Sequence, residues 1–118
     1  MPHVFVDGTL KRGGSNHALL AAQRFAGPAQ TAPAYRLLQL DGYPGMIRVE
    51  TGGRSIEGEL WEVDLPCLAR LDELEGTDLG LYSRVPVALL APWAHCAAET
   101  YLYARSVEGR RDLGVRFG

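Results

Sequence analysis

The segment from Asp64 to Gly76 reads as a helix with two defined ends, and it constrains the fold more than any other part of the sequence. Asp64 is a favourable N-cap, Pro66 suits the first helical turn, and Gly76 is typical of the position just after a last turn. The pattern predicts a helix over 65–75. Four leucines recur at the helical period and form its expected apolar stripe: Leu65, Leu68, Leu71 and Leu74.

Glu75 closes this helix and falls almost over Leu68, on the face that packs against the core. Desolvation disfavours its anion, and the last turn lies at the negative end of the helix dipole. Both effects raise the pKa of a carboxyl, so Glu75 is a candidate general base for work near neutral pH. Two alternatives remain open. The Glu75 side chain turns back to solvent from a frayed last turn, or Asp72, within about 60° on the helical wheel, is the functional carboxylate.

The length and charge of the chain exclude several classes of function. With 118 residues, the chain is expected to form a single domain over residues 1–118, too short for a second folding unit. The formal net charge of −2, with basic residues scattered, gives no electrostatic footprint for nucleic acid. We find no signal-peptide pattern and no apolar run of the roughly 20 residues that cross a membrane. Cys67 and Cys96 are too few for a disulfide framework and lack metal-ligand spacing, which favours a soluble protein of the reducing cytoplasm.

Short segments with frequent turns dominate the rest of the chain. Strands are expected over 3–7, 30–40, 55–63, 82–90 and 97–104, and a short helix capped by Ser15 over 16–23. Gly27-Pro28 is expected to end that helix, and Asp41-Gly42 is expected to form a turn. With a further strand counted between the turns at Asp41-Gly42 and Gly52-Gly53, the resulting order is strand, helix, three strands, helix, two strands, without a repeated βαβ unit. This order predicts an α+β fold in which a mixed sheet curls into a barrel with flanking helices.

A glycine-rich loop follows the first expected strand, over residues 8–15. Its glycines have the spacing of a phosphate-binding P-loop, but Gly14 stands where the lysine of such a loop must be. Successive backbone N–H groups can still bind a carboxylate or a developing oxyanion. The alternative is an ordinary strand-to-helix turn, with Lys11 and Arg12 as solvated flanking charges.

Several motifs resemble, in order along nearly the whole chain, those of the γ-glutamylcyclotransferase-like superfamily, especially its γ-glutamylamine cyclotransferase branch. They are Val4-Phe5-Val6-Asp7-Gly8-Thr9-Leu10-Lys11-Arg12-Gly13 with Asn16-His17, Tyr43-Pro44-Gly45, Glu57-Gly58-Glu59-Leu60-Trp61, Leu71-Asp72-Glu73-Leu74-Glu75-Gly76, Leu81-Tyr82-Ser83-Arg84 and Tyr101-Leu102-Tyr103. The resemblance implies a mixed barrel with a cavity beside the loop after the first strand. It also implies that Glu75 is the catalytic acid and base, and that Tyr82 lies near the pocket. The substrate-binding loop would be Asp7, Gly8, Thr9 and Leu10.

The chain departs from this resemblance at Asp7, where such proteins usually have tyrosine. A carboxylate beside an anion-binding loop would oppose a substrate carboxylate and raise the pKa of Glu75 further. Asp7 therefore indicates altered specificity or loss of activity, unless its side chain simply turns to solvent.

The expected function is a γ-glutamyl cyclotransferase that releases 5-oxoproline and a free amine or amino acid by intramolecular attack, with no metal or other cofactor. The expected partner is thus a small γ-glutamyl substrate. The alternative is a non-catalytic binding protein that keeps the fold and the pocket. Hydrolysis by Ser15 and His17 is disfavoured, since residues two apart on a helix do not face each other.

Overall fold

The computed structural model describes residues 1–117 and contains seven strands, one α-helix and two 3-10 helices. The strands are β1 (His3–Val6), β2 (Arg24–Gln30), β3 (Tyr35–Gln39), β4 (Pro44–Arg48), β5 (Glu57–Glu62), β6 (Tyr82–Val87) and β7 (Ala98–Tyr103). The helices are η1 (His17–Leu20), α1 (Leu65–Leu74) and η2 (Thr77–Leu79). No helix in this part of the chain is long and apolar enough to span a membrane.

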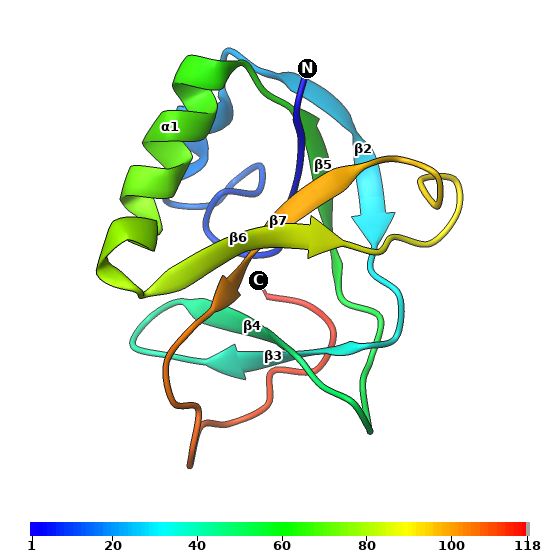
Figure 1. Ribbon diagram of the computed structural model, residues 1–118, viewed down its shortest axis with the longest axis vertical. Helices are drawn as coiled ribbons and strands as arrows, with labels where there is room; N and C mark the ends of the chain where they lie inside the picture. The colour runs from blue at the N-terminus through cyan, green and yellow to red at the C-terminus, as the bar shows by residue number, and fades with distance from the viewer. Residues whose placement is uncertain (118) are drawn as a thin grey trace.

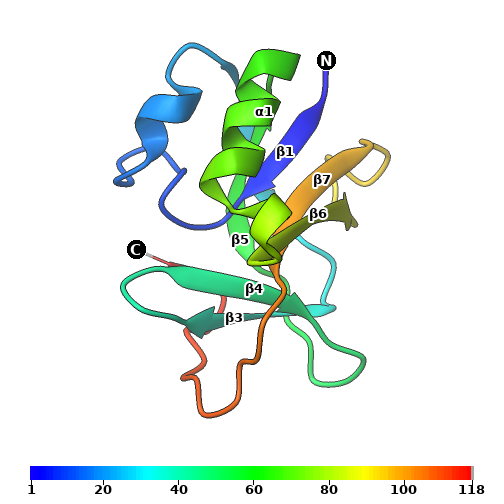
Figure 2. The same cartoon turned by 60° about the vertical axis from the view of Figure 1, so that its left-hand side comes forward.

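Five strands form a mixed sheet in the order β2-β5-β1-β7-β6, and β3 and β4 form a separate hairpin. β1 is central, antiparallel to β5 and parallel to β7. Figure 1 shows α1 along one side of this sheet, and Figure 2 shows the β3–β4 hairpin lying across its lower end. The α+β prediction is confirmed. β4 packs against β7 without a hydrogen-bonded ladder between them, and the described strands form two sheets, so the barrel stays a prediction.

β1 is buried on both of its faces, as its apolar sequence predicts. Val4 and Val6 belong to one core cluster, which also contains the buried residues of α1. Phe5 points the other way, because successive strand side chains alternate, and packs in a second cluster with residues of the β3–β4 hairpin. The loop that follows β1 therefore begins between the two core clusters.

Helix α1 has the predicted ends but a narrower buried face than its leucine stripe predicts. Its N-cap forms as expected, with the Cys67 N–H donating to Asp64 Oδ1 at 2.8 Å. The buried residues are Cys67, Leu68 and Leu71. The expected core positions Leu65 and Leu74 are 70% and 41% exposed, which corrects the predicted stripe. Both lie in terminal turns, and only the middle of this ten-residue helix packs fully on the sheet.

Replacement of Leu71 by alanine is expected to lower the free energy of unfolding by about 2–5 kcal/mol, because it leaves a cavity under α1. Leu74→Ala, the same substitution one turn later at a partly exposed position, is the matched control and should cost much less. Urea denaturation of both variants measures the difference. Equal losses would contradict the packing described here.

The predicted helix over 16–23 forms only a 3-10 helix, His17–Leu20. The residue before it is Asn16, and Ser15 does not cap it. Asn16 instead donates from Nδ2 to Thr9 Oγ1 at 3.0 Å, which ties the glycine loop to the start of this helix. The Asn16 side chain therefore bonds to the preceding loop, and it makes no capping hydrogen bond to the helix that follows.

Four strands, rather than three, lie between η1 and α1. β2 runs through the expected break at Gly27-Pro28, with a register shift against β5 between Phe25 and Gly27. Such an irregularity lets a strand continue through residues that normally interrupt it. β4 begins at Pro44, which the sequence places in a turn segment, and it pairs only with β3. An edge position tolerates the missing N–H of proline.

Candidate active site

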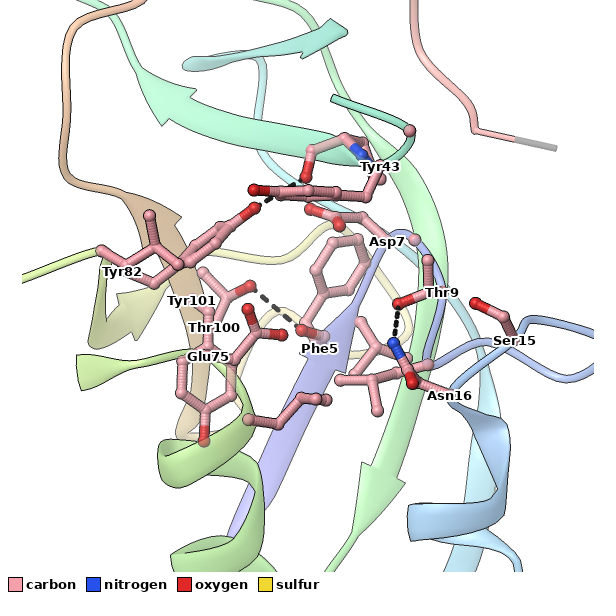
Figure 3. A pocket seen from close by; sticks show the side chains of 17 residues that line it. Phe5, Asp7, Thr9, Ser15, Asn16, Tyr43, Glu75, Tyr82, Thr100 and Tyr101 are labelled. Carbon is pink, nitrogen blue, oxygen red and sulfur yellow. Dashed lines mark hydrogen bonds between the residues drawn. The ribbon is translucent and has the colours of Figure 1, made fainter. Parts of the chain in front are cut away.

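A cavity of about 330 Å³ opens where the end of β1, the end of α1, β6 and the loop before β4 meet. The structure brings all six predicted site residues to its lining: Asp7, Gly8, Thr9, Leu10, Glu75 and Tyr82. Figure 3 shows the side chains of this cavity. Tyr43 and Tyr101 line it as well.

Glu75 is the C-cap residue of α1, and its side chain points into the cavity (Figure 3). Its N–H still donates to Leu71 O at 2.9 Å, so the backbone continues the helical turn. Gly76 then adopts a left-handed conformation, φ 63°, and ends the helix, as the sequence predicts. Burial raises the pKa of Glu75 to about 7, and the nearby Asp7 carboxylate raises it in the same direction. Glu75 can therefore exchange a proton near neutral pH.

Asp72, the alternative candidate for the functional carboxylate, is held in an ion-pair network and does not line the cavity. Arg84 Nε lies 2.8 Å from Asp72 Oδ1, and Tyr101 Oη donates to the same oxygen at 2.7 Å. Arg84 also pairs with Glu99 at 2.7 Å. The network joins α1 to β6 and β7, and an acid neutralised in this way suits a structural role. The geometry therefore favours Glu75 over Asp72.

Three consecutive residues of the glycine loop, Gly8, Thr9 and Leu10, line the same cavity. Within residues 1–117, the backbone hydrogen bonds that close the loop do not use the N–H groups of Gly8, Thr9 or Leu10. The closing bonds are Lys11 N–H to Gly8 O at 3.1 Å and Asn16 N–H to Thr9 O at 2.9 Å. The three free donors can hold an anion without a charged side chain.

Glu59 anchors this loop from β5, a contact that the sequence analysis did not anticipate. Glu59 is 9% exposed, and its carboxylate accepts hydrogen bonds from Arg12 N at 2.9 Å and Arg12 Nε at 3.0 Å. Trp61 Nε1 donates to it at 3.2 Å. Burial opposes ionisation of Glu59, but these hydrogen bonds outweigh it and keep its pKa below the ordinary value. The sequence signal that could have indicated the burial of Glu59 is its place within a predicted strand, directly before the apolar pair Leu60-Trp61.

The two basic residues of the loop have specific partners. Arg12, expected as a solvated flanking charge, is ion-paired with Glu59 and lies 3.9 Å from the centroid of the Phe25 ring. Lys11 Nζ donates to Phe117 O at 2.5 Å. Both contacts brace the loop from outside the cavity, since neither basic residue lines it.

Tyr82 forms a fixed part of the cavity wall. Its hydroxyl donates to Pro44 O at 2.9 Å, and its ring meets Tyr103 edge to face at 5.3 Å between centroids. Burial and the neighbouring carboxylates raise the pKa of Tyr82, so the hydroxyl stays protonated. The expected position of Tyr82 near the pocket therefore matches a positioning role better than proton transfer.

Asp7 follows the last residue of β1, and its side chain also points into the cavity (Figure 3). Burial raises the pKa of Asp7 to about 7, although the charge of Lys11 acts in the opposite direction. The cavity thus holds two carboxyls, Asp7 and Glu75, that titrate in the same range and repel each other when both are ionised.

Other chemistries have less support in the described residues. His17 Nδ1 lies 3.0 Å from Leu10 O and its ring packs on Trp61, so it is not oriented as a base for Ser15. Among residues 1–117, no group of three His, Cys, Asp or Glu side chains is arranged to hold a metal ion.

Comparison with known proteins places these features in a family. A family model described as "Gamma-glutamyl cyclotransferase, AIG2-like" matches residues 4–116. The human protein named gamma-glutamylaminecyclotransferase is 32% identical over an alignment of 123 positions, which covers 90% of this chain and 80% of the human protein. The crystal structure of an aig2-like protein from Mus musculus superposes with a TM-score of 0.77 at 28% identity, covering 88% of this chain and 78% of that one.

The matches do not all extend over the whole of the related proteins. Those to relatives from Vibrio cholerae, rat and Drosophila melanogaster cover 60%, 56% and 50% of the lengths of those proteins. The rat protein, named gamma-glutamylaminecyclotransferase, is 35% identical over an alignment of 83 positions that covers 64% of this chain.

Proposed function

The chain belongs to the gamma-glutamyl cyclotransferase, AIG2-like family, and on that premise we propose that it converts a γ-glutamyl compound into 5-oxoproline and a free amine or amino acid. The observation that carries the proposal is the placement of Glu75. Its carboxyl, with a pKa raised to about 7, shares one cavity with three unused backbone N–H groups. We further propose that residues 1–118 form one domain of barrel type that acts in the reducing cytoplasm.

In the proposed reaction, Glu75 accepts a proton from the α-ammonium of the substrate. The freed amine attacks the γ-carbonyl carbon of the same molecule and forms the new carbon–nitrogen bond of the five-membered ring. Glu75 then donates its proton to the leaving nitrogen as the carbonyl re-forms and the original amide bond breaks, and the ring nitrogen loses its extra proton to the released amine or to solvent. The substrate supplies its own nucleophile, and one carboxyl carries out both proton transfers.

The N–H groups of Gly8, Thr9 and Leu10 would bind the substrate carboxylate or the oxyanion that forms on the γ-carbonyl. Donors that are already oriented stabilise such a charge without reorganisation during the reaction. They would also align the amine with the carbonyl, and orientation is a major term in ring closure. Glu59 supports this role because its bonds to Arg12 brace the loop.

The direct test is to incubate the protein with γ-glutamyl amines, γ-glutamyl amino acids and ε-(γ-glutamyl)-lysine, and to measure 5-oxoproline by mass spectrometry. Release of 5-oxoproline with a stoichiometric amount of free amine is the expected result. Ligand binding without product would instead favour the non-catalytic binding protein.

Activity and stability are expected to depend on pH in opposite directions. Proton acceptance requires ionised Glu75, so kcat/KM should rise about 100-fold from pH 5 to a plateau above pH 7. The folded protein holds protons on Glu75 and Asp7 that the unfolded chain releases, since their ordinary pKa values are 4.5 and 3.8. This contribution to stability is therefore full below about pH 4 and lost as the pH rises through about 7.

Initial rates and thermal unfolding from pH 5 to 8 check both trends on the same protein. The apparent pKa belongs to the pair of carboxyls, because the two titrate together. Glu75→Gln should flatten part of the stability profile between pH 5 and 7. Stability that increases over this interval, with no change in Glu75→Gln, would contradict the raised pKa values.

A further inference from the structure

The charged groups that line the cavity are all acidic. Asp7 and Glu75 line it, whereas no Lys, Arg or His of the described chain does so. They enter from different elements, Asp7 from the end of β1 and Glu75 from the end of α1 (Figure 3). In the same view, the Asp7 carboxyl is directed toward Tyr43 and Tyr82.

The charge of Lys11 lowers the pKa of Asp7 but does not outweigh the effect of burial. Lys11 Nζ donates to Phe117 O, and Lys11 is not among the residues that line the cavity. The ion pairs found within residues 1–117 involve other carboxylates, such as Glu59 with Arg12 and Asp72 with Arg84. Asp7 is thus a carboxyl aimed into a ligand-sized space with no cationic side chain beside it there.

The glutamyl half of a substrate provides no counterpart for Asp7, if the proposed function holds. Its α-ammonium is the proton donor to Glu75, and its α-carboxylate or oxyanion is bound by the N–H groups of the loop. The remaining negative group in the cavity is Asp7. A positive charge on the other half of the substrate, the leaving amine, would complement Asp7.

We propose that Asp7 binds a second, positively charged nitrogen on the leaving amine, so that the preferred substrates are γ-glutamyl conjugates of diamines or of similar basic amines. This inference rests on the proposed function. The rings of Tyr43 and Tyr82 would flank the bound cation and add cation–π attraction. Such a substrate also relieves the repulsion between Asp7 and Glu75, which burial strengthens.

A neutral leaving group would leave Asp7 either ionised without a partner or protonated. Both states forgo a charge-assisted hydrogen bond, which in a partly buried site is a strong interaction. An anionic leaving group would in addition be repelled by Asp7. The charge of the leaving group should therefore change kcat/KM more than its size or apolar character.

The test compares three γ-glutamyl conjugates of nearly equal length, made from 1,4-diaminobutane, n-pentylamine and 4-aminobutanoate. In the unmodified protein, kcat/KM for the diamine conjugate should exceed that for the n-pentylamine conjugate by about 10–100-fold, with the anionic conjugate lowest. In Asp7→Asn, which keeps the shape and removes the charge, the ratio should fall to within about threefold. Glu50→Gln, which removes one negative charge from an exposed position outside the cavity, should keep the full preference.

The ratio of two substrates in one preparation does not depend on the fraction of folded protein, so partial unfolding of Asp7→Asn does not affect it. If that variant does not fold, product inhibition of the unmodified protein decides instead: 1,4-diaminobutane should inhibit more strongly than n-pentylamine. Equal turnover of the cationic and neutral conjugates, or a preference retained in Asp7→Asn, overturns the inference and leaves the proposed function intact. Absence of 5-oxoproline from all three conjugates, and from the γ-glutamyl amino acids, overturns the proposed function and the inference with it.

Discussion

Glu75→Gln is expected to reduce kcat for 5-oxoproline release by about 1,000-fold or more, because one group performs both proton transfers and a single general acid or base typically contributes 10²–10⁴. The amide has nearly the shape of the carboxyl, so the end of α1 and the cavity should remain. Ligand binding should persist, since the N–H groups of Gly8, Thr9 and Leu10 are untouched. Single-turnover measurements and calorimetric binding separate these two effects.

The fold of Glu75→Gln should be at least as stable as that of the unmodified protein at pH 8. Its ionised carboxyl is partly buried near Asp7, and removing that charge ends the repulsion. Glu73→Gln is the matched control, because Glu73 is exposed on the same helix two residues earlier. It should retain nearly full activity. Turnover by Glu75→Gln within tenfold of the unmodified protein would exclude Glu75 as the acid and base.

Gly14→Ala is expected to lower kcat/KM by about 100-fold, comparable with the loss of one oxyanion-binding donor. A Cβ at position 14 would collide with the backbone carbonyl of Thr9 and approach Lys11 O to 2.9 Å. These are backbone atoms, so no change of rotamer relieves the collision. The peptide between Thr9 and Leu10 has to move, and with it the N–H group of Leu10, a residue that lines the cavity.

Gly13→Asn provides the control for Gly14→Ala in the same loop. Gly13 has a positive φ of 84° with open space around its Cα, and asparagine tolerates this conformation better than most residues. The control should therefore lose little activity. Steady-state kinetics together with melting temperatures distinguish a displaced loop from general unfolding. A Gly14→Ala protein with kcat/KM within threefold of the unmodified value would show that the loop amides are not positioned by this contact.

Local sequence signals predicted the elements that carry the site. Three consecutive apolar residues before Asp7 are typical of a buried strand, and β1 is buried on both faces. Asp64 and Gly76 marked the ends of α1, since capping depends on the neighbouring backbone alone. The same kind of reasoning failed for η1, where Asn16 bonds to the preceding loop, and for β4, whose strand conformation depends on its pairing with β3.

Contacts between distant parts of the chain could not be read from local patterns. Glu59 lies 47 residues from Arg12, and nothing near either residue in the sequence indicates that they pair. The leucine stripe of α1 was overestimated for the same reason. Periodicity shows which residues share a face, but the neighbouring elements determine how much of that face is covered.

By itself, the sequence determined a capped helix with Asp72 and Glu75 near its end, and a glycine loop after a buried strand. Only the tertiary structure decided which carboxylate is available for chemistry. Arg84 from β6 and Tyr101 from β7 bind Asp72, whereas Glu75 faces a cavity that also contains Asp7 and the free N–H groups of the loop. The physical reason is that a side chain's charge and pKa depend on which distant groups surround it, and folding alone brings those groups together.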